Sequence, residues 1–323
     1  MASRSAPSAF TVNLSSVSFT GEGLVRPESV LCTASGTLFV SDKRGGVMRI
    51  GADGVQTFIG KSAIIPNGIA LQRDRSLLVA NLSDDGGVWR IAENGSVTPF
   101  LTELDGKRLG SVNFVMVDRR ERVWICVSTV RAGDHQFRKD IADGFIVLHD
   151  ERGTRVVADG VHWTNECRID AQEEYLYVCE TFGRRLSRFR LSESGELGAR
   201  ETVAEFGVGT FPDGLAVDAE GGLWVVSVVS NRIIRVLPDG RQHVVMEDYD
   251  QHHLDQVENA FQANQLGRPM LYDNHIKVLP NVTSLAFGGP DLKTAYMGSI
   301  NGDRIAVFRS PVAGLPPAHW DWA

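Results

Sequence analysis

Short apolar runs separated by turns rich in Asp, Gly and Arg follow one another along almost the whole chain. In one stretch, PDGLAVD is followed by a turn, by LWVVS, by a second turn and by RIIRV. Apolar runs of this length, bounded by Gly and Asp turns, are typical of β-strands. The same order of runs returns six times with a period of about 40 residues, which predicts six copies of one supersecondary unit.

Each unit starts with an oxygen-bearing side chain beside its first apolar run. We call these side chains the slot residues: Glu28, Asn67, Asn113, Asn165, Asp213 and Ser284. Four short strands in each of six units predict an all-β fold, a six-bladed β-propeller with four-stranded blades. We expect one domain over residues 1–323. The segment SAFTVNLSSVSFT near the N-terminus should complete the last blade and close the ring, because closure removes open sheet edges.

The longest interval between slot residues separates Asp213 from Ser284 and contains an insertion over residues 247–280. Leu254, Val257 and Phe261 recur there at helical spacing, which predicts a short amphipathic helix. Insertions of this length on a rigid scaffold are often binding elements or lids. A helix that only packs on the outside of the propeller is the alternative, and the sequence leaves both open.

Composition narrows the choice of partners. The formal net charge is −7 and no run of Lys or Arg stands out, so neither nucleic acid nor a membrane surface is an expected partner. No window holds the ~18–20 apolar residues of a membrane span, and MASRSAPSAF lacks the apolar centre of a signal peptide. Four cysteines lie far apart in apolar runs, which favours reduced, buried thiols over disulfides or a zinc site. We expect a cytoplasmic protein that acts on a small molecule, with its oligomeric state left open.

The slot residues form a candidate metal site. The first strand of each propeller blade lines the central axis, so Glu28, Asn113, Asn165 and Asp213 should converge at one end of the tunnel. Two carboxylates in a partly dehydrated funnel repel each other unless one is protonated or a cation intervenes. Carboxylate and amide oxygens suit Ca²⁺, with Zn²⁺, Mn²⁺ or Mg²⁺ as alternatives. Any one Asn or Asp before a strand is more often a turn residue, but recurrence in register favours ligands.

Several strings resemble a known family. The strings PES, NGIAL, TNE, PDGLAVD and TSLAFGGPDLKTAYMGS resemble the SMP-30/gluconolactonase/LRE-like family of six-bladed propellers, over about residues 24–315. The resemblance implies a divalent-metal-dependent hydrolase, chiefly a lactonase. It also implies that Glu28, Asn113, Asn165 and Asp213 hold the metal, in agreement with the slot pattern.

One string departs from the family. Sugar lactonases of the family carry an Arg-x-Asn-Asp string in the third blade, whose arginine contacts the sugar. Here Ser111 replaces the arginine and Phe114 replaces the aspartate. We therefore expect a lactone less polar than a sugar lactone. Asn67, Ser284 and His275 are further candidate contacts to the substrate.

The predicted chemistry is polarisation of the substrate carbonyl by the metal, followed by attack of water. Asp213 is the candidate general base, and direct attack by its carboxylate is left open. Asn113 either binds the ion or orients the substrate and water. Glu166 follows Asn165 directly and is expected on the opposite face of its strand.

Three other functions compete with a lactonase. One is hydrolysis of a different electrophile, such as a phosphotriester, an enol ether or another ester. A second is a non-catalytic binding propeller in which the metal only stabilises the fold. A metal-free condensing enzyme of the strictosidine-synthase type is the least favoured, because it has no need of all four ligand positions.

Overall fold

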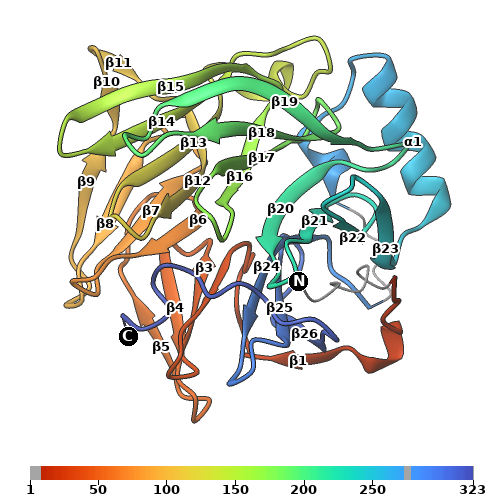
Figure 1. Cartoon of the computed structure of the whole chain (residues 1–323), viewed down its shortest axis with the longest axis horizontal. Coiled ribbons are helices and arrows are strands. Elements are labelled where there is room, and N and C mark those ends of the chain that lie inside the picture. Colours follow the sequence, from red (N-terminus) through yellow and green to blue (C-terminus); the bar gives the residue numbers. More distant parts are fainter. Residues whose placement is uncertain (1–8, 273–277, 323) are drawn as a thin grey trace, which may run out of the picture.

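The computed structural model describes residues 9–272 and 278–322. Six four-stranded antiparallel sheets are arranged around one axis in this part of the chain, which confirms the predicted six-bladed propeller (Figure 1). In every blade the first strand along the chain lies innermost, apart from the N-terminal strand described below.

The strands of the six blades are as follows. Blade 1 contains β2 (Val30–Cys32), β3 (Leu38–Asp42), β4 (Gly46–Ile50) and β5 (Gln56–Ile59), and blade 2 contains β6 (Pro66–Leu71), β7 (Leu77–Asn81), β8 (Val88–Ile91) and β9 (Val97–Leu101). Blade 3 contains β12 (Ser111–Val117), β13 (Val123–Thr129), β14 (Gly144–Asp150) and β15 (Gly153–Val161), and blade 4 contains β16 (Thr164–Ile169), β17 (Tyr175–Glu180), β18 (Arg185–Leu191) and β19 (Leu197–Glu205). Blade 5 contains β20 (Pro212–Val217), β21 (Leu223–Ser227), β22 (Arg232–Val236) and β23 (Gln242–Met246), and blade 6 contains β24 (Val282–Gly288), β25 (Thr294–Ser299) and β26 (Ile305–Arg309). A small hairpin, β10 (Glu103–Leu104) with β11 (Lys107–Arg108), and the short 3-10 helices η1 (Leu14–Ser16), η2 (Gly133–Gln136) and η3 (Arg268–Leu271) complete the elements outside the insertion helix.

The N-terminal strand closes the ring, as predicted. β1 (Ser18–Thr20) pairs antiparallel with β26 and is the outermost strand of blade 6. Blade 6 is therefore built from both ends of the chain, so that its outer edge is paired and the ring cannot open without breaking this pairing.

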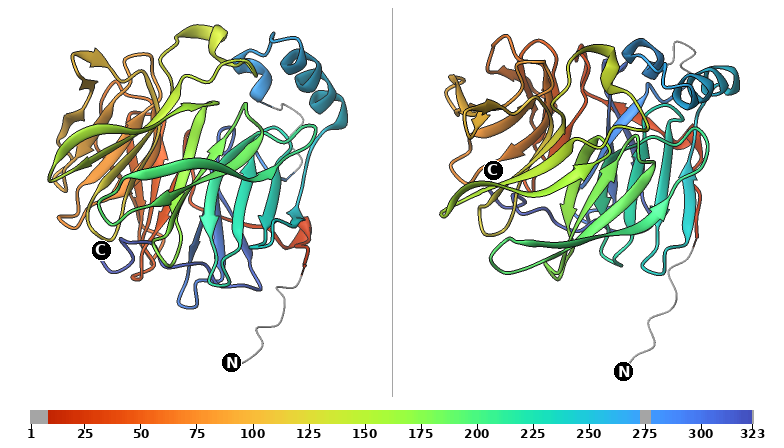
Figure 2. Two further views of the ribbon diagram at one scale, coloured as in Figure 1. Left: turned by 45° about the horizontal axis from the view of Figure 1, so that its top comes forward. Right: turned by 90° about the horizontal axis from the view of Figure 1, so that it is seen from above.

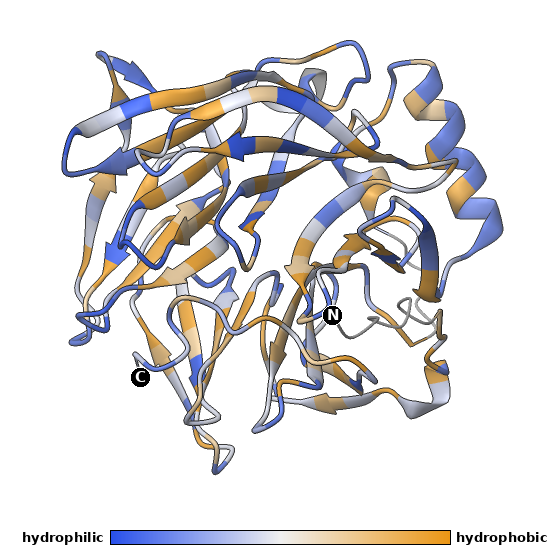
Figure 3. Ribbon diagram, viewed as in Figure 1, coloured by the Kyte–Doolittle hydropathy of each residue, from blue (hydrophilic) through white to orange (hydrophobic). Residues whose placement is uncertain are grey.

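The core consists of apolar layers between neighbouring blades. One layer between blades 5 and 6 contains Trp224, Phe287 and Phe308, and the other five interfaces each have their own cluster. Figure 3 shows the matching pattern, with apolar residues along the strands and polar residues at many of the turns. All four cysteines lie buried and free in these layers, as expected.

The predicted insertion helix is confirmed as α1 (Gln251–Gln262), capped by Asp250, whose side chain accepts a hydrogen bond from the His253 amide. Its buried residues are those of the predicted apolar stripe, and Phe261 packs edge-on against Phe211. Arg184 lies over both of these rings and forms an ion pair with Glu258 of the helix. The helix is therefore firmly docked on blades 4 and 5.

Opposite faces of the propeller are covered by different segments. α1 and the loop over residues 130–143 lie on one face, and the C-terminal segment crosses the other (Figure 2). On that second face, which we call the underside, Leu315 donates to the Val217 carbonyl and Ala34 donates to the Trp320 carbonyl, each at 2.8 Å. No helix in the described ranges is long and apolar enough to span a bilayer.

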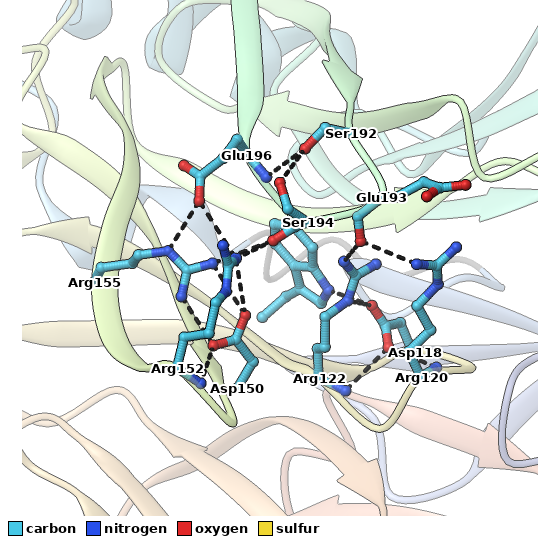
Figure 4. Close-up of polar contacts among 11 residues, drawn as sticks. Asp118, Arg120, Arg122, Asp150, Arg152, Arg155, Ser192, Glu193, Ser194 and Glu196 are labelled. Atoms are coloured by element: carbon cyan, nitrogen blue, oxygen red, sulfur yellow. Dashed lines mark hydrogen bonds and ion pairs between the residues drawn. The ribbon is translucent and has the colours of Figure 1, made fainter.

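Charged turns tie blades 3 and 4 together at the underside. Arg120 and Arg122 of blade 3 both donate to the main-chain carbonyl of Glu193 in blade 4, at 3.0 and 3.1 Å (Figure 4). Asp118 accepts from Arg122 and from the Trp124 indole, so the arginine is fixed by its own blade as well. These bonds therefore join blades 3 and 4 at the end of the inner strands opposite to the slot residues.

The interblade layers predict a clear difference between buried and exposed apolar residues. Leu285→Ala, which removes a 1% exposed side chain between blades 5 and 6, should lower the free energy of unfolding by about 2–5 kcal/mol. Val208→Ala, at a 61% exposed position, should change it by less than about 0.5 kcal/mol. Urea unfolding measures both, and equal effects would contradict the assignment of the core.

Candidate functional site

A β-bulge lies at the slot position in five of the six inner strands. The pairing register shifts at or beside Asn67, Asn113, Asn165, Asp213 and Thr283, the last next to the slot residue Ser284. A bulge leaves one residue out of the ladder and re-aims its side chain. Glu28 reaches the same level differently, because it precedes the first residue of β2.

A belt of side-chain hydrogen bonds joins all six blades at this level. Each bond runs from a side-chain N–H or O–H to a main-chain carbonyl of the neighbouring blade. The donors and acceptors are Arg26 to Pro66 (3.1 Å), Asn67 to Asn113 (2.9 Å), Ser128 to Thr164 (2.9 Å), Thr181 to Pro212 (2.7 Å), Asn281 to Val228 (3.2 Å) and Ser284 to Glu28 (2.7 Å). The belt fixes the slot backbones relative to one another.

The two slot carboxylates are buried within range of each other's charge. Glu28 is 4% exposed and Asp213 is 8% exposed. Burial, opposed by Arg26 and reinforced by Glu166, raises the pKa of Glu28 to about 7. Burial, followed by the charges of Glu28 and Glu166, raises the pKa of Asp213 well above its usual range. Both groups would ionise more readily if a cation lay between them.

Glu166 lies nearer to the site than strict strand alternation predicts. It shares the bulge of β16 with Asn165, so the two-residue period does not hold there. Its carboxylate accepts from the Leu215 amide of blade 5 at 3.1 Å and forms an ion pair with Arg168 at 2.7 Å. Burial raises the pKa of Glu166, while Arg168 and the Leu215 amide lower it. Both bonds use Oε2, so Arg168 and the Leu215 amide hold one oxygen of this carboxyl group beside the site.

The side chains present fit an oxygen-coordinated cation. Asn165 donates through Nδ2 to Thr181 at 3.0 Å, and its Oδ1 is buried without a hydrogen-bond partner in the described structure. The Asn165 amide also donates to the Asp213 carboxylate, and Asn67 donates to Glu28. The two carboxylates and the orphaned carbonyl oxygen still offer the oxygen atoms that a hard divalent ion prefers. Within residues 9–272 and 278–322, no three His, Cys, Asp or Glu side chains are placed to hold a metal by themselves. Any ion here therefore depends on the amide oxygens.

The other predicted residues occupy different positions. Asn67 accepts from Arg26 at 2.7 Å and donates to Asn113 Oδ1 at 3.2 Å, so it lies beside the site and orients Asn113. Ser111 is buried and pairs with Thr129, at the slot end of β12. Phe114 packs in the layer between blades 3 and 4, with Arg168 over its ring at 4.5 Å.

Two further predicted residues, Ser284 and His275, and two residues that were not predicted complete the comparison with the sequence. Ser284 holds the Glu28 backbone through the belt, whereas His275 lies outside the described residues. Arg26 and Thr181 were not predicted as site residues, yet both bond a slot side chain. A signal existed for Arg26, because it lies two residues before Glu28. The sequence contained no such signal for Thr181, because Thr181 follows the end of β17 whereas Asn165 lies at the start of β16.

Family membership follows from sequence comparison. A family model described as the SMP-30/Gluconolactonase/LRE-like region matches residues 76–247, which is more than half of the chain. The chain belongs to this family. The resemblance to the SMP-30/gluconolactonase/LRE-like family that was inferred from the sequence is thus confirmed.

Individual relatives differ in what their names say. Pentonolactonase XacC of Haloferax volcanii is 28% identical over 239 residues, covering 73% of this chain and 67% of the relative. Protein STRICTOSIDINE SYNTHASE-LIKE 4 of Arabidopsis thaliana is 26% identical over 170 residues, covering 50% of this chain and 44% of the relative. A solved calcium-binding protein, regucalcin from Agrobacterium tumefaciens, has a TM-score of 0.67 at 18% identity and covers 92% of this chain and 96% of that one. The structural match shows a shared fold.

The buried charge predicts a pH-dependent effect of Glu28→Gln on metal-free protein. The pKa of Glu28 in the folded protein is about 7, above its ordinary value of 4.5. Ionisation of Glu28 is therefore disfavoured in the folded state, and the free energy of unfolding falls as the pH rises from about 4.5 to 7. The shift corresponds to about 3 kcal/mol. Urea unfolding after EDTA treatment should show the variant more stable than the wild type at pH 8 and similar to it at pH 4. Glu193→Gln, at an exposed turn, is the control, and an equal difference at both pH values would contradict the assignment.

Proposed function

We propose that this protein is a divalent-metal-dependent hydrolase that opens a lactone. One observation carries the proposal: two buried carboxylates lie within range of each other's charge, and the amide that bonds one of them has an oxygen without a partner in the described structure. A purely structural tunnel has no need of two converging buried carboxylates, because their repulsion lowers stability. Membership of the family and the likeness to a pentonolactonase support a lactone as the substrate.

Glu28, Asn165 and Asp213 would hold the ion, with Asn113 as a fourth oxygen donor. All four offer oxygen, and this favours Ca²⁺ over metals that prefer nitrogen or sulfur ligands. The shared fold with a calcium-binding protein supports the same choice. When bound, the ion supplies Lewis-acid polarisation of the substrate carbonyl.

The chain itself supplies the proton chemistry and the orientation. Asp213 accepts the proton of the attacking water, because a bound cation would keep its carboxylate ionised and able to accept. Asn67 holds the Asn113 amide so that its Oδ1 retains a free lone pair for the ion or the water. Direct attack by Asp213 on the carbonyl carbon is the alternative, and oxygen-18 incorporation into the Asp213 carboxylate in a single turnover distinguishes the two.

The substrate is proposed to be less polar than a sugar lactone. Ser111 provides no charge where sugar lactonases of the family have arginine. Trp163, Phe182 and Phe211 form an aromatic cluster with α1 on the slot face. The name of the pentonolactonase relative points the other way, toward a sugar lactone, so substrate polarity is the first property to measure.

Two alternatives compete with this proposal. The same carboxylates and ion could serve hydrolysis of another electrophile, such as a phosphotriester or an enol ether. The likeness to a strictosidine-synthase-like protein favours a metal-free condensation, but it covers only half of this chain. The buried carboxylate pair argues for the metal-dependent reaction.

Removing the proposed base should abolish the reaction. Asp213→Asn keeps the shape of the side chain but removes its charge, and we expect kcat for lactone opening to fall by about 10²-fold or more. EDTA should stop the wild-type reaction, and added Ca²⁺ should restore it. Asp239→Asn, at an exposed turn, should leave the rate unchanged. Full activity of Asp213→Asn would exclude the proposed role.

A matched pair of lactones tests substrate polarity. δ-Valerolactone should be opened with a higher kcat/KM than glucono-δ-lactone, because no arginine at position 111 contacts the sugar hydroxyls. Ser111→Arg should reverse this preference toward the sugar lactone if the position faces the substrate. A wild-type preference for glucono-δ-lactone would overturn the proposal of an apolar substrate while leaving the lactonase reaction intact.

A further inference from the structure

We infer that Thr181 is a positioning residue that turns the Asn165 amide so that its oxygen faces the metal site. This inference rests on the proposed metal site. Thr181 follows the last residue of β17 and is 4% exposed, and Asn165 is 3% exposed. Water therefore does not compete for their polar atoms.

The orientation follows from counting one proton. The Thr181 hydroxyl donates its only proton to the Pro212 carbonyl at 2.7 Å, as part of the belt. Its oxygen can then only accept a hydrogen bond from Asn165, and the amide atom at 3.0 Å must be the nitrogen. The Asn165 oxygen consequently points away from Thr181, where no donor in the described structure meets it.

Without this hydroxyl, the opposite orientation becomes favourable. The Asn165 amide already donates to the Asp213 carboxylate. A flipped amide would put its N–H₂ group where the unpartnered oxygen now lies, and carboxylates, as acceptors, attract such donors. That orientation puts two hydrogens where a cation would need an oxygen. Thr181 thus opposes the attraction of the carboxylates for the N–H₂ group. Its hydroxyl is neutral, so replacing it changes no charge in the site.

Thr181 itself is held from two sides. Its amide donates to the Trp163 carbonyl at 3.2 Å, and its hydroxyl bridges to blade 5 through Pro212. Trp163 has a φ of 63°, an uncommon value for a non-glycine residue, and it comes two positions before Asn165. Thr181 is therefore tied to the strand entry that also carries Asn165.

Asn113 is oriented on the same principle by different atoms. Arg26 takes Asn67 Oδ1, which leaves the Asn67 nitrogen to donate to Asn113. The amides of Asn113 and Asn165 thus both have their orientation set by side chains that are not proposed metal ligands. Thr181 gives the cleaner test of this principle, because replacing Arg26 also removes a positive charge from beside the carboxylates.

The test is calorimetric Ca²⁺ binding by EDTA-treated full-length protein, a readout that does not depend on turnover. Thr181→Val keeps the size and removes the hydroxyl, and it should weaken Ca²⁺ binding by about 10–100-fold. Thr181→Ser should bind within about threefold of the wild type. Ser310→Ala removes a buried hydroxyl that lies outside the belt and bonds only its own turn, and this variant should bind Ca²⁺ nearly normally.

An additional cycle separates orientation from loss of structure. A carboxylate has oxygen on both sides, so in an Asn165→Asp background Thr181→Val should have little further effect on Ca²⁺ affinity. If Thr181→Val does not fold, Thr181→Ala replaces it in the same cycle. If the wild type binds Ca²⁺ and the Thr181→Val protein binds it with the same affinity, the inference about Thr181 is overturned, while the proposed metal site is not. Absence of Ca²⁺ binding by the wild type would overturn the proposed metal site and the inference with it.

Discussion

The burial of two carboxylates within range of each other's charge is the constraint on which the site depends. Glu28 and Asp213 come from opposite parts of the sequence, and the propeller brings them together by placing each inner strand on one axis. Their repulsion costs stability in the apo protein, and Glu166 adds to it. Only a rigid scaffold can hold such groups in place, and the closed ring with its belt of interblade hydrogen bonds supplies that rigidity. A cation bound between them, as we propose, would convert the same arrangement into a stabilising one.

The bulges explain how a regular sheet produces this convergence. A strand without a bulge alternates its side chains between the two faces of the blade, toward the neighbouring blades. By removing residues from the ladder, the bulges release the slot side chains of blades 2 to 5 from this alternation, whereas in blade 6 the released residue is Thr283. The belt then fixes the slot backbones, and Thr181 and Asn67 set the amides of two slot residues. Position and orientation are thus controlled by separate groups, which is what a site built for one ion requires.

Much of the architecture could be predicted from the sequence because it repeats. The six units, the closing N-terminal strand and α1 all follow from periodicity, and periodicity reflects which side chains are buried. The bulges leave no such signal. Glu166 was expected on the opposite face for that reason, since alternation fails where two residues oppose one. Thr181 could not be found either, because its bond to Asn165 joins strand ends that only the fold brings together. Phe114 packs between blades 3 and 4, and its predicted contact with the substrate stays a prediction.

The most direct test of this account counts the protons that leave when the ion binds. Calcium titrations of the EDTA-treated protein at pH 7, in two buffers with different ionisation enthalpies, give both the stoichiometry and the number of protons released. One ion per chain with release of about one to two protons is expected, because the raised pKa values keep protons on the carboxyl groups until a cation replaces them. Binding without proton release, or no binding at all, would contradict the claim that two buried carboxylates form the metal site.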